Sequence, residues 1–234
     1  MRTAIRFGLL VVFSYAAFAQ TQPDAAEILK KVSETYKDVS QYEVESTVTI
    51  HDPSSGRDLS GSTRIAFKGP DKYREEAKGS LLTLIADPSK PVVDEAITVY
   101  DGSKMWVYVP KSNEYRVYAV PKLPRDSRPE DADLFMGIGP YRHAVEAFAP
   151  GHFLREERIA SGGTADCFVI EATGPGAGAL LWIDKNNYHV LRVDSAAEGY
   201  GSSQVFKTVK LNEPLSDDLF KFVPPPGATK LGEP

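Results

Sequence analysis

The chain has 234 residues and a formal net charge of −5, with acidic and basic residues interspersed along it. Hydrophobic residues make up 42% and charged residues 25%, which is typical of a globular protein with one sizeable core. No basic stripe runs through the sequence, so we expect no nucleic-acid partner.

The N-terminus has the features of a secretory signal peptide. Arg2 and Arg6 supply positive charge, Phe7–Phe18 is a short apolar run, and an A-x-A cleavage motif ends at Ala19. The apolar run is shorter than the ~20 residues that a membrane-spanning helix needs. The residue directly after the cleavage motif is Gln20 rather than a cysteine, so we expect no lipid anchor of the lipobox type. The sequence therefore predicts export to the periplasm with cleavage after Ala19.

The first segment after this peptide predicts an amphipathic helix over Pro23–Val39. Pro23 suits the first helical position, and Asp24 and Glu27 suit the positive N-terminal end. The apolar residues of this segment recur at helical spacing: Ala25, Ile28, Leu29, Val32, Tyr36 and Val39. This single apolar stripe requires a partner surface, and a sheet is the natural one.

Alternating apolar and polar residues predict about ten or eleven antiparallel strands. The segments are Gln41–Ile50, Leu59–Lys68, Lys72–Ala77, Leu81–Ile85, three short strands within Ala96–Val120, His152–Ala160, Cys167–Thr173, Ala179–Asp184, Tyr188–Ser195 and Ser203–Leu211. Two further segments predict helical structure, a short helix at Pro140–Phe148 and a helical turn at Leu215–Phe220 with Ser216 as its N-cap. We expect a signal peptide at 1–19 and one domain at 20–234, with a proline-rich insertion near 121–150.

The middle strand of the Ala96–Val120 meander is apolar on both faces. Met105 and Val107 point to one side, and Trp106 and Tyr108 point to the other. A sheet in contact with water on one side keeps that side polar, so we expect both faces to be covered. The surplus of apolar surface indicates a binding cavity or a packed lid, and the sequence leaves open which face lines it.

Residues with catalytic or metal-binding spacing are not evident. The four histidines lie far apart, and no nucleophile motif is present. Cys167 is the single cysteine and lies in an apolar strand, where a buried thiol is expected. We expect a protein that is not an enzyme and that holds no cofactor and no metal.

Three motifs stand out, at Phe67–Tyr73, Tyr100–Pro110 and Phe220–Gly227. They resemble those of the outer-membrane lipoprotein-sorting carriers, the LolA-type family. Tyr100–Pro110 is similar to the family's D-G-x-x-x-W-x-Y-x-P hairpin, and Phe67–Tyr73 to its Lys-Arg-Pro turn and the following aromatic strand. Phe220–Gly227 is similar to its C-terminal F-x-F-x-P-P-x-G segment. Gly69 stands where these carriers often place an arginine that ties to the lid.

The resemblance implies a mainly β (α+β) fold: an incomplete, strongly curved antiparallel β-barrel with a few helices as a lid over an apolar concave face. It implies a periplasmic carrier that shields the acyl chains of lipoproteins, or another lipid, for transfer to the outer membrane. The implied partners are an inner-membrane release complex and an outer-membrane receptor. We expect a monomer.

Strand alternation and the helical stripe predict which residues line the apolar cavity and its lid. They are Ile28, Val32, Val44, Val48, Ile65, Phe67, Tyr73, Val107 and Val117. Two alternatives remain open. One is an envelope sensor or interaction domain of the same fold that binds a lipidated or membrane-associated protein, and the other is an enzyme acting on envelope lipids.

Overall fold

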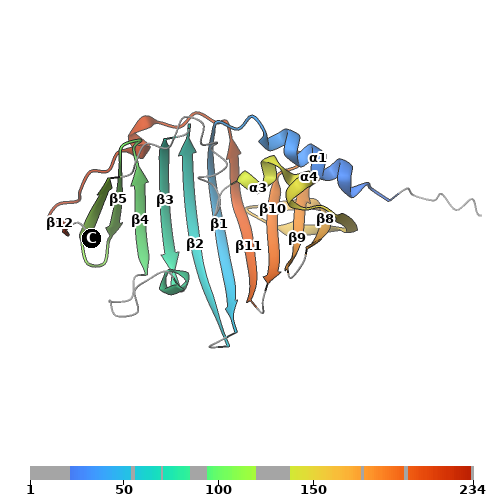
Figure 1. Cartoon of the computed structure of the whole chain (residues 1–234), viewed down its shortest axis with the longest axis horizontal. Helices are drawn as coiled ribbons and strands as arrows, with labels where there is room; N and C mark the ends of the chain where they lie inside the picture. The colour runs from blue at the N-terminus through green and yellow to red at the C-terminus, as the bar shows by residue number, and fades with distance from the viewer. Residues whose placement is uncertain are drawn as a thin grey trace, which may run out of the picture.

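The described part of the chain forms one open, curved sheet of twelve strands (Figure 1). This computed structural model describes residues 22–53, 56–69, 71–84, 94–119, 138–174, 177–197 and 200–232. The strand order is β12-β6-β5-β4-β3-β2-β1-β11-β10-β9-β8-β7, and only β12 and β6 pair in parallel. The strands are β1 Gln41–Asp52, β2 Arg57–Lys68, β3 Lys72–Gly79, β4 Glu95–Tyr100, β5 Lys104–Val109, β6 Glu114–Ala119, β7 Gly151–Ala160, β8 Thr164–Gly174, β9 Ala177–Asp184, β10 Val190–Ala197, β11 Tyr200–Leu211 and β12 Thr229–Lys230. The predicted mainly β, incompletely closed fold is confirmed, with one or two strands more than expected.

Three helices cover one face of this sheet over β8–β11 (Figure 1). They are α1 (Ala25–Tyr36), α3 (Gly139–Arg142) and α4 (Ala144–Ala147), and both short helices contact α1. The carboxylate of Asp24 accepts a hydrogen bond from the amide of Ala26 at 2.9 Å, so Asp24 caps the helix and α1 begins at Ala25 rather than at Pro23. We call the covered side the helix face and the opposite side the outer face.

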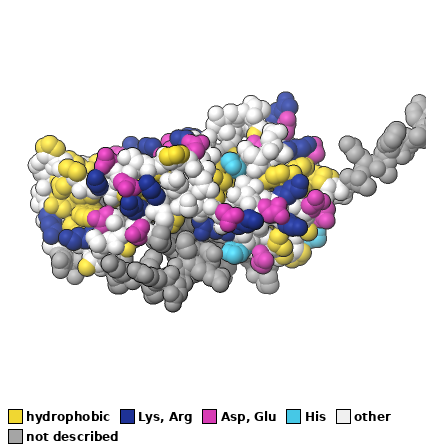
Figure 2. All heavy atoms as spheres, turned by 90° about the horizontal axis from the view of Figure 1, so that it is seen from above, with side chains coloured by type: hydrophobic (Ala, Val, Ile, Leu, Met, Phe, Trp, Pro, Cys, Tyr) yellow, Lys and Arg dark blue, Asp and Glu magenta, His cyan; other side chains and the backbone are white. Residues whose placement is uncertain are grey.

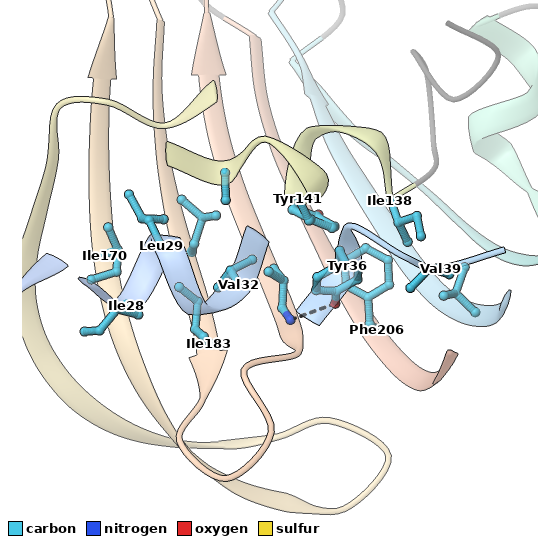
Figure 3. Close-up of a cluster of buried hydrophobic side chains, with 14 of the residues drawn as sticks. Ile28, Leu29, Val32, Tyr36, Val39, Ile138, Tyr141, Ile170, Ile183 and Phe206 are labelled. Carbon is cyan, nitrogen blue, oxygen red and sulfur yellow. Dashed lines mark hydrogen bonds between the residues drawn. The ribbon is translucent and has the colours of Figure 1, made fainter. Parts of the chain in front are cut away.

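The main core lies between α1 and the helix face (Figure 3). Every residue of the predicted stripe is buried, and Val32 is fully inaccessible. The rings of Tyr36 and Tyr141 lie 5.3 Å apart between the end of α1 and α3, and Tyr141 also meets Phe206 edge-on. The hydroxyl of Tyr36 accepts a hydrogen bond from the amide of Val190 at 3.1 Å, and burial raises the pKa of this phenol. The predicted packing of the helix on a sheet is confirmed.

The outer face carries a smaller apolar cluster and a charged centre. Ile159, Cys167, Val169, Trp182 and Leu191 form the cluster on β7–β10. Cys167 is buried as predicted, and burial raises the pKa of its thiol to about 12. Near the middle of the sheet, Glu43 is buried between Arg64 and Lys210, at 2.8 and 2.9 Å.

The C-terminal segment crosses the outer face at the other end of the sheet. It begins with the 3-10 helix η2 (Asp217–Phe220), which Ser216 caps as predicted. The ring of Phe222 then packs within 6.2 Å of the rings of Trp106, Tyr108 and Tyr115, and hydrophobic side chains gather at this end of the molecule in Figure 2. This contact covers the outer face of β5, as the two-sided apolar pattern predicts.

Two predicted elements are different in the structure. Leu81–Ile85 was expected to be a strand, but the chain forms the 3-10 helix η1 (Ser80–Leu84). Gly79 has φ 111°, and a Cβ there would lie 2.4 Å from the carbonyl oxygen of Ser60, so only glycine allows the chain to turn out of the sheet at this point. The apolar run that follows cannot continue the ladder.

The predicted helix at Pro140–Phe148 is interrupted. His143, with φ −119° and ψ 40°, separates α3 from α4 and has no helical conformation. The signal peptide lies outside the described residues, as does Lys122–Gly137 of the proline-rich insertion. Within the described residues, no helix has the length and hydropathy needed to cross a membrane.

Candidate ligand-binding face

A continuous row of large side chains crosses the helix face from β1 to β6. The register pairs each member with the next on the neighbouring strand. We call the following set the aromatic row: Tyr42, Phe67, Tyr73, Tyr100, Met105 and Tyr118. Tyr42 and Phe67 are buried and stacked at 5.4 Å, whereas the four members on β3–β6 are partly exposed. Neighbouring strands lie about 4.8 Å apart, so the row spans roughly 24 Å.

A second row runs beside the first and is more polar. Its members, from β1 to β6, are Val44, Ile65, Glu75, Thr98, Val107 and Arg116. Beyond it, the hydroxyl groups of buried Ser46 and Thr63 are hydrogen-bonded to each other at 2.9 Å. The side-chain amide of Gln204 donates a hydrogen bond to the Ser46 hydroxyl at 3.1 Å. These polar groups mark where the apolar part of the helix face ends along β1 and β2.

The structure distributes the predicted cavity residues over three environments. Those in the main buried cluster are Ile28, Val32, Val44, Ile65 and Phe67, with Tyr73 packed against it. Val48 is buried on the helix face, beyond the polar pair Ser46 and Thr63. Val107 and Val117 are partly exposed on β5 and β6.

Val107 and Val117 lie on opposite faces of the sheet. Val107 pairs with Arg116, whereas Val117 pairs with Trp106, whose ring contacts Phe222 on the outer face. One apolar surface therefore cannot contain both valines. Alternation within each strand was visible in the sequence, but the register between β5 and β6 was not.

Glu75 is a polar group within this apolar surface. It lies between Ile65 and Thr98, and the hydroxyl of Tyr73 donates a hydrogen bond to its Oε2 at 3.1 Å. Burial raises the pKa of the Glu75 carboxyl above its usual range, although the Tyr73 hydrogen bond opposes the shift. Alternation alone does not predict this burial, because a glutamate in an alternating strand is normally interpreted as solvated.

Replacing Glu75 by glutamine is expected to stabilise the protein at pH 7. With a raised pKa, the folded protein binds more protons than the unfolded chain above about pH 4.3, so stability falls as pH rises through this window. Glutamine keeps an acceptor for Tyr73 and does not ionise. Thermal unfolding from pH 3 to 8 should show a higher Tm for E75Q at pH 7, with the difference vanishing in acid.

The matched control is E76Q. Glu76 is the next residue on β3, faces the outer side and forms an ion pair with Arg74 at 2.8 Å. This variant should be equal to or less stable than the parent at pH 7. If E75Q behaved like E76Q, Glu75 would not carry the cost of a buried charge.

Arg142 is a buried charge that sequence patterns missed. It lies on α3 with 8% of its surface exposed, and its Nη2 donates to the carbonyl oxygen of Val39 at 2.8 Å. Its neighbour Tyr141 lies in the core. The position of Arg142 in a short segment rich in apolar residues was its one sequence signal.

Other features of the described residues offer no competing site. An open hollow of about 220 Å³ on the outer face is lined mainly by charged side chains, among them Glu45, Arg64 and Lys78. No group of His, Cys, Asp or Glu side chains in the described part of the chain is arranged to hold a metal ion. The helix face is therefore the candidate for an apolar ligand.

Comparison with known proteins agrees with this architecture. A family model described as "Predicted periplasmic protein (DUF2092)" matches residues 25–126. An uncharacterized protein of Methanocaldococcus jannaschii is 24% identical over 222 residues, which is 94% of this chain. The chain spans only 57% of that relative's length.

Several solved structures are similar to this chain, and two of them are described here. LprF from Mycobacterium bovis is 15% identical, with a TM-score of 0.51 over 83% of this chain and 96% of its own. A LolA superfamily protein from Nitrosomonas europaea is 17% identical, with a TM-score of 0.35 over 86% of this chain and 99% of its own. The likeness to LprF shows the fold. The resemblance predicted from the hairpin and C-terminal motifs agrees with the similar structures, which include a LolA superfamily protein.

Proposed function

We propose that the protein is a periplasmic carrier that shields the acyl chains of lipoproteins, or of another lipid, on the helix face for transfer to the outer membrane. The observation that carries the proposal is the aromatic row. It passes from buried Tyr42 and Phe67 beneath the helices to four partly exposed members on β3–β6. An acyl chain could therefore bind to the partly exposed members of the row and continue towards its buried members beneath the helices.

Burial of the chain supplies the binding energy. Each buried methylene contributes ~0.8 kcal/mol, so ten methylenes contribute about 8 kcal/mol before the cost of ordering the chain. Micromolar affinity corresponds to a net gain of about 8 kcal/mol, so burial of more than ten methylenes is needed to reach this range, which permits both capture and release. The short helices α3 and α4 pack on α1 and form part of the lid over the proposed site.

The donor and acceptor belong to the same proposal. An inner-membrane release complex would load the carrier, and an outer-membrane receptor would accept the lipid. The match to a family described as periplasmic supports this location, and the N-terminal residues support export with cleavage after Ala19. Binding, rather than catalysis, is what the described side chains favour.

Native mass spectrometry of the protein, purified from a periplasmic extract without detergent, tests this function. We expect a co-purifying lipid or lipoprotein mass on a chain that begins at Gln20. A lipid-free mass that stays unchanged after incubation with a triacylated lipoprotein would contradict the carrier. In that case a pull-down that recovers one dominant envelope protein would favour a sensor or interaction domain.

A further inference from the structure

Arg142 is buried with most of its hydrogen-bonding capacity unused. The guanidinium group has five N–H donors. The contact from Nη2 to the carbonyl oxygen of Val39, at 2.8 Å, is its single hydrogen bond among the described residues. Its Nε is fully buried and has no partner.

No carboxylate neutralises this cation within the described ranges. The buried carboxylate of Glu43 is already bound by Arg64 and Lys210. Glu75 accepts a hydrogen bond from Tyr73. A buried charge without a partner destabilises the folded protein, so the site as it stands favours the binding of an anionic acceptor.

The position of Arg142 connects it to the aromatic row. Val39, which accepts its hydrogen bond, lies in the main buried cluster three residues before Tyr42, the inner end of the row. Figure 3 shows Tyr141, the residue before Arg142, beside Tyr36 and near Val39. A ligand whose chain follows the row towards β1 would therefore bring its head group to α3.

We propose that Arg142 binds the anionic head group of the ligand, a carboxylate or phosphate attached to a long acyl chain that lies along the aromatic row. This rests on the proposed function and narrows it from lipids in general to acidic lipids. The planar guanidinium group can donate two parallel hydrogen bonds to the oxygens of a carboxylate or of a phosphate. A neutral lipid would fill the same row but leave the buried donors unpaired, which a site of this kind rejects.

The test measures affinities of the delipidated protein for three monomeric probes by equilibrium dialysis. Palmitate carries a carboxylate, lysophosphatidate a phosphate, and palmitoylglycerol is neutral. We expect the unchanged protein to bind at least one acidic probe tenfold or more tightly than palmitoylglycerol. R142Q should bring that affinity down to the neutral level without changing the affinity for palmitoylglycerol, and R142K should retain part of the preference.

The control is R158Q. Arg158 forms an exposed ion pair with Asp166 at 2.7 Å on β7 and β8, at the edge of the sheet far from the aromatic row, so its loss removes one positive charge without touching the proposed site. Equal affinities of the unchanged protein for acidic and neutral probes, or an equal loss in R142Q and R158Q, would overturn the role of Arg142 while leaving the carrier intact. If none of the three probes bound, that result would contradict the proposed carrier function itself.

The two acidic probes also separate the sources of the head group. Tighter binding of palmitate would indicate a free fatty acid, and tighter binding of lysophosphatidate would indicate a phospholipid. If R142Q does not fold, the preference of the unchanged protein for acidic over neutral probes, and its retention in R142K, decides the question.

Discussion

Replacing Leu29 by alanine is expected to destabilise the protein by about 2–5 kcal/mol, the range for removing a fully buried leucine side chain. Leu29 is 2% exposed and lies at the centre of the contact between α1 and the sheet. The cavity would open against β7 and β8, because a Cβ built at Gly151 lies 2.8 Å from Leu29 Cδ1 and 3.3 Å from Ile170. Urea denaturation followed by tryptophan fluorescence measures the change in midpoint.

Gly151 supplies a sharp control through a double-mutant cycle. G151A alone should destabilise the protein, because the new methyl group meets Leu29 Cδ1. In the L29A background that atom is absent, so the same methyl group partly fills the cavity. We expect the double variant to be more stable than the sum of the two single changes predicts. Strict additivity would mean that Leu29 and Gly151 do not share this contact.

Replacing Val107 by glutamate is expected to reduce the affinity for an acyl-chain ligand by tenfold or more. Val107 lies on the helix face beside the aromatic row and is partly exposed, so the carboxylate would charge the binding surface while the folded state tolerates it. V117E is the matched control, because Val117 is also partly exposed but lies on the outer face of the adjacent strand. Equilibrium dialysis with palmitoylglycerol measures both affinities.

The comparison depends on both variants being folded. Circular dichroism and the urea midpoint should place V107E and V117E close to the parent. Equal affinities in the two folded variants would contradict the assignment of the ligand to the helix face. A loss confined to V117E would place the ligand on the outer face, beneath the C-terminal segment.

The sequence predicted those elements in which local periodicity and burial agree. The stripe of α1 and the alternation along β1 and β2 each bury one side, so their patterns translate directly into structure. Ser216 was recognisable as a cap because its hydroxyl has a local partner, the amide of Asp218. Elements were less predictable where backbone atoms far away in the sequence determine the conformation. At Gly79, the carbonyl group of Ser60 leaves no room for a side chain where the chain turns out of the sheet.

The candidate site was predicted only in part, for a similar reason. Burial of Val32, Val44 and Ile65 follows from their spacing. The separation of Val107 from Val117 depends on how β5 pairs with β6, which alternation within a strand does not specify. Arg142 and Glu75 could not be identified as buried charges, because their burial arises from segments far away in the chain.

The strand order has a consequence for how the chain folds. β1–β6 and β7–β11 are each built from neighbours in sequence, and the pairing of β1 with β11 is what joins them. Tyr42 pairs with Leu211, so β1 and β11 can pair only after most of the chain has been brought together. Contacts between residues so far apart in the sequence form slowly. During synthesis, the N-terminal segments emerge long before β11 does. Until then the edge of β1 and the apolar stripe of α1 remain without their partners, so the nascent protein is expected to need protection from aggregation for that interval.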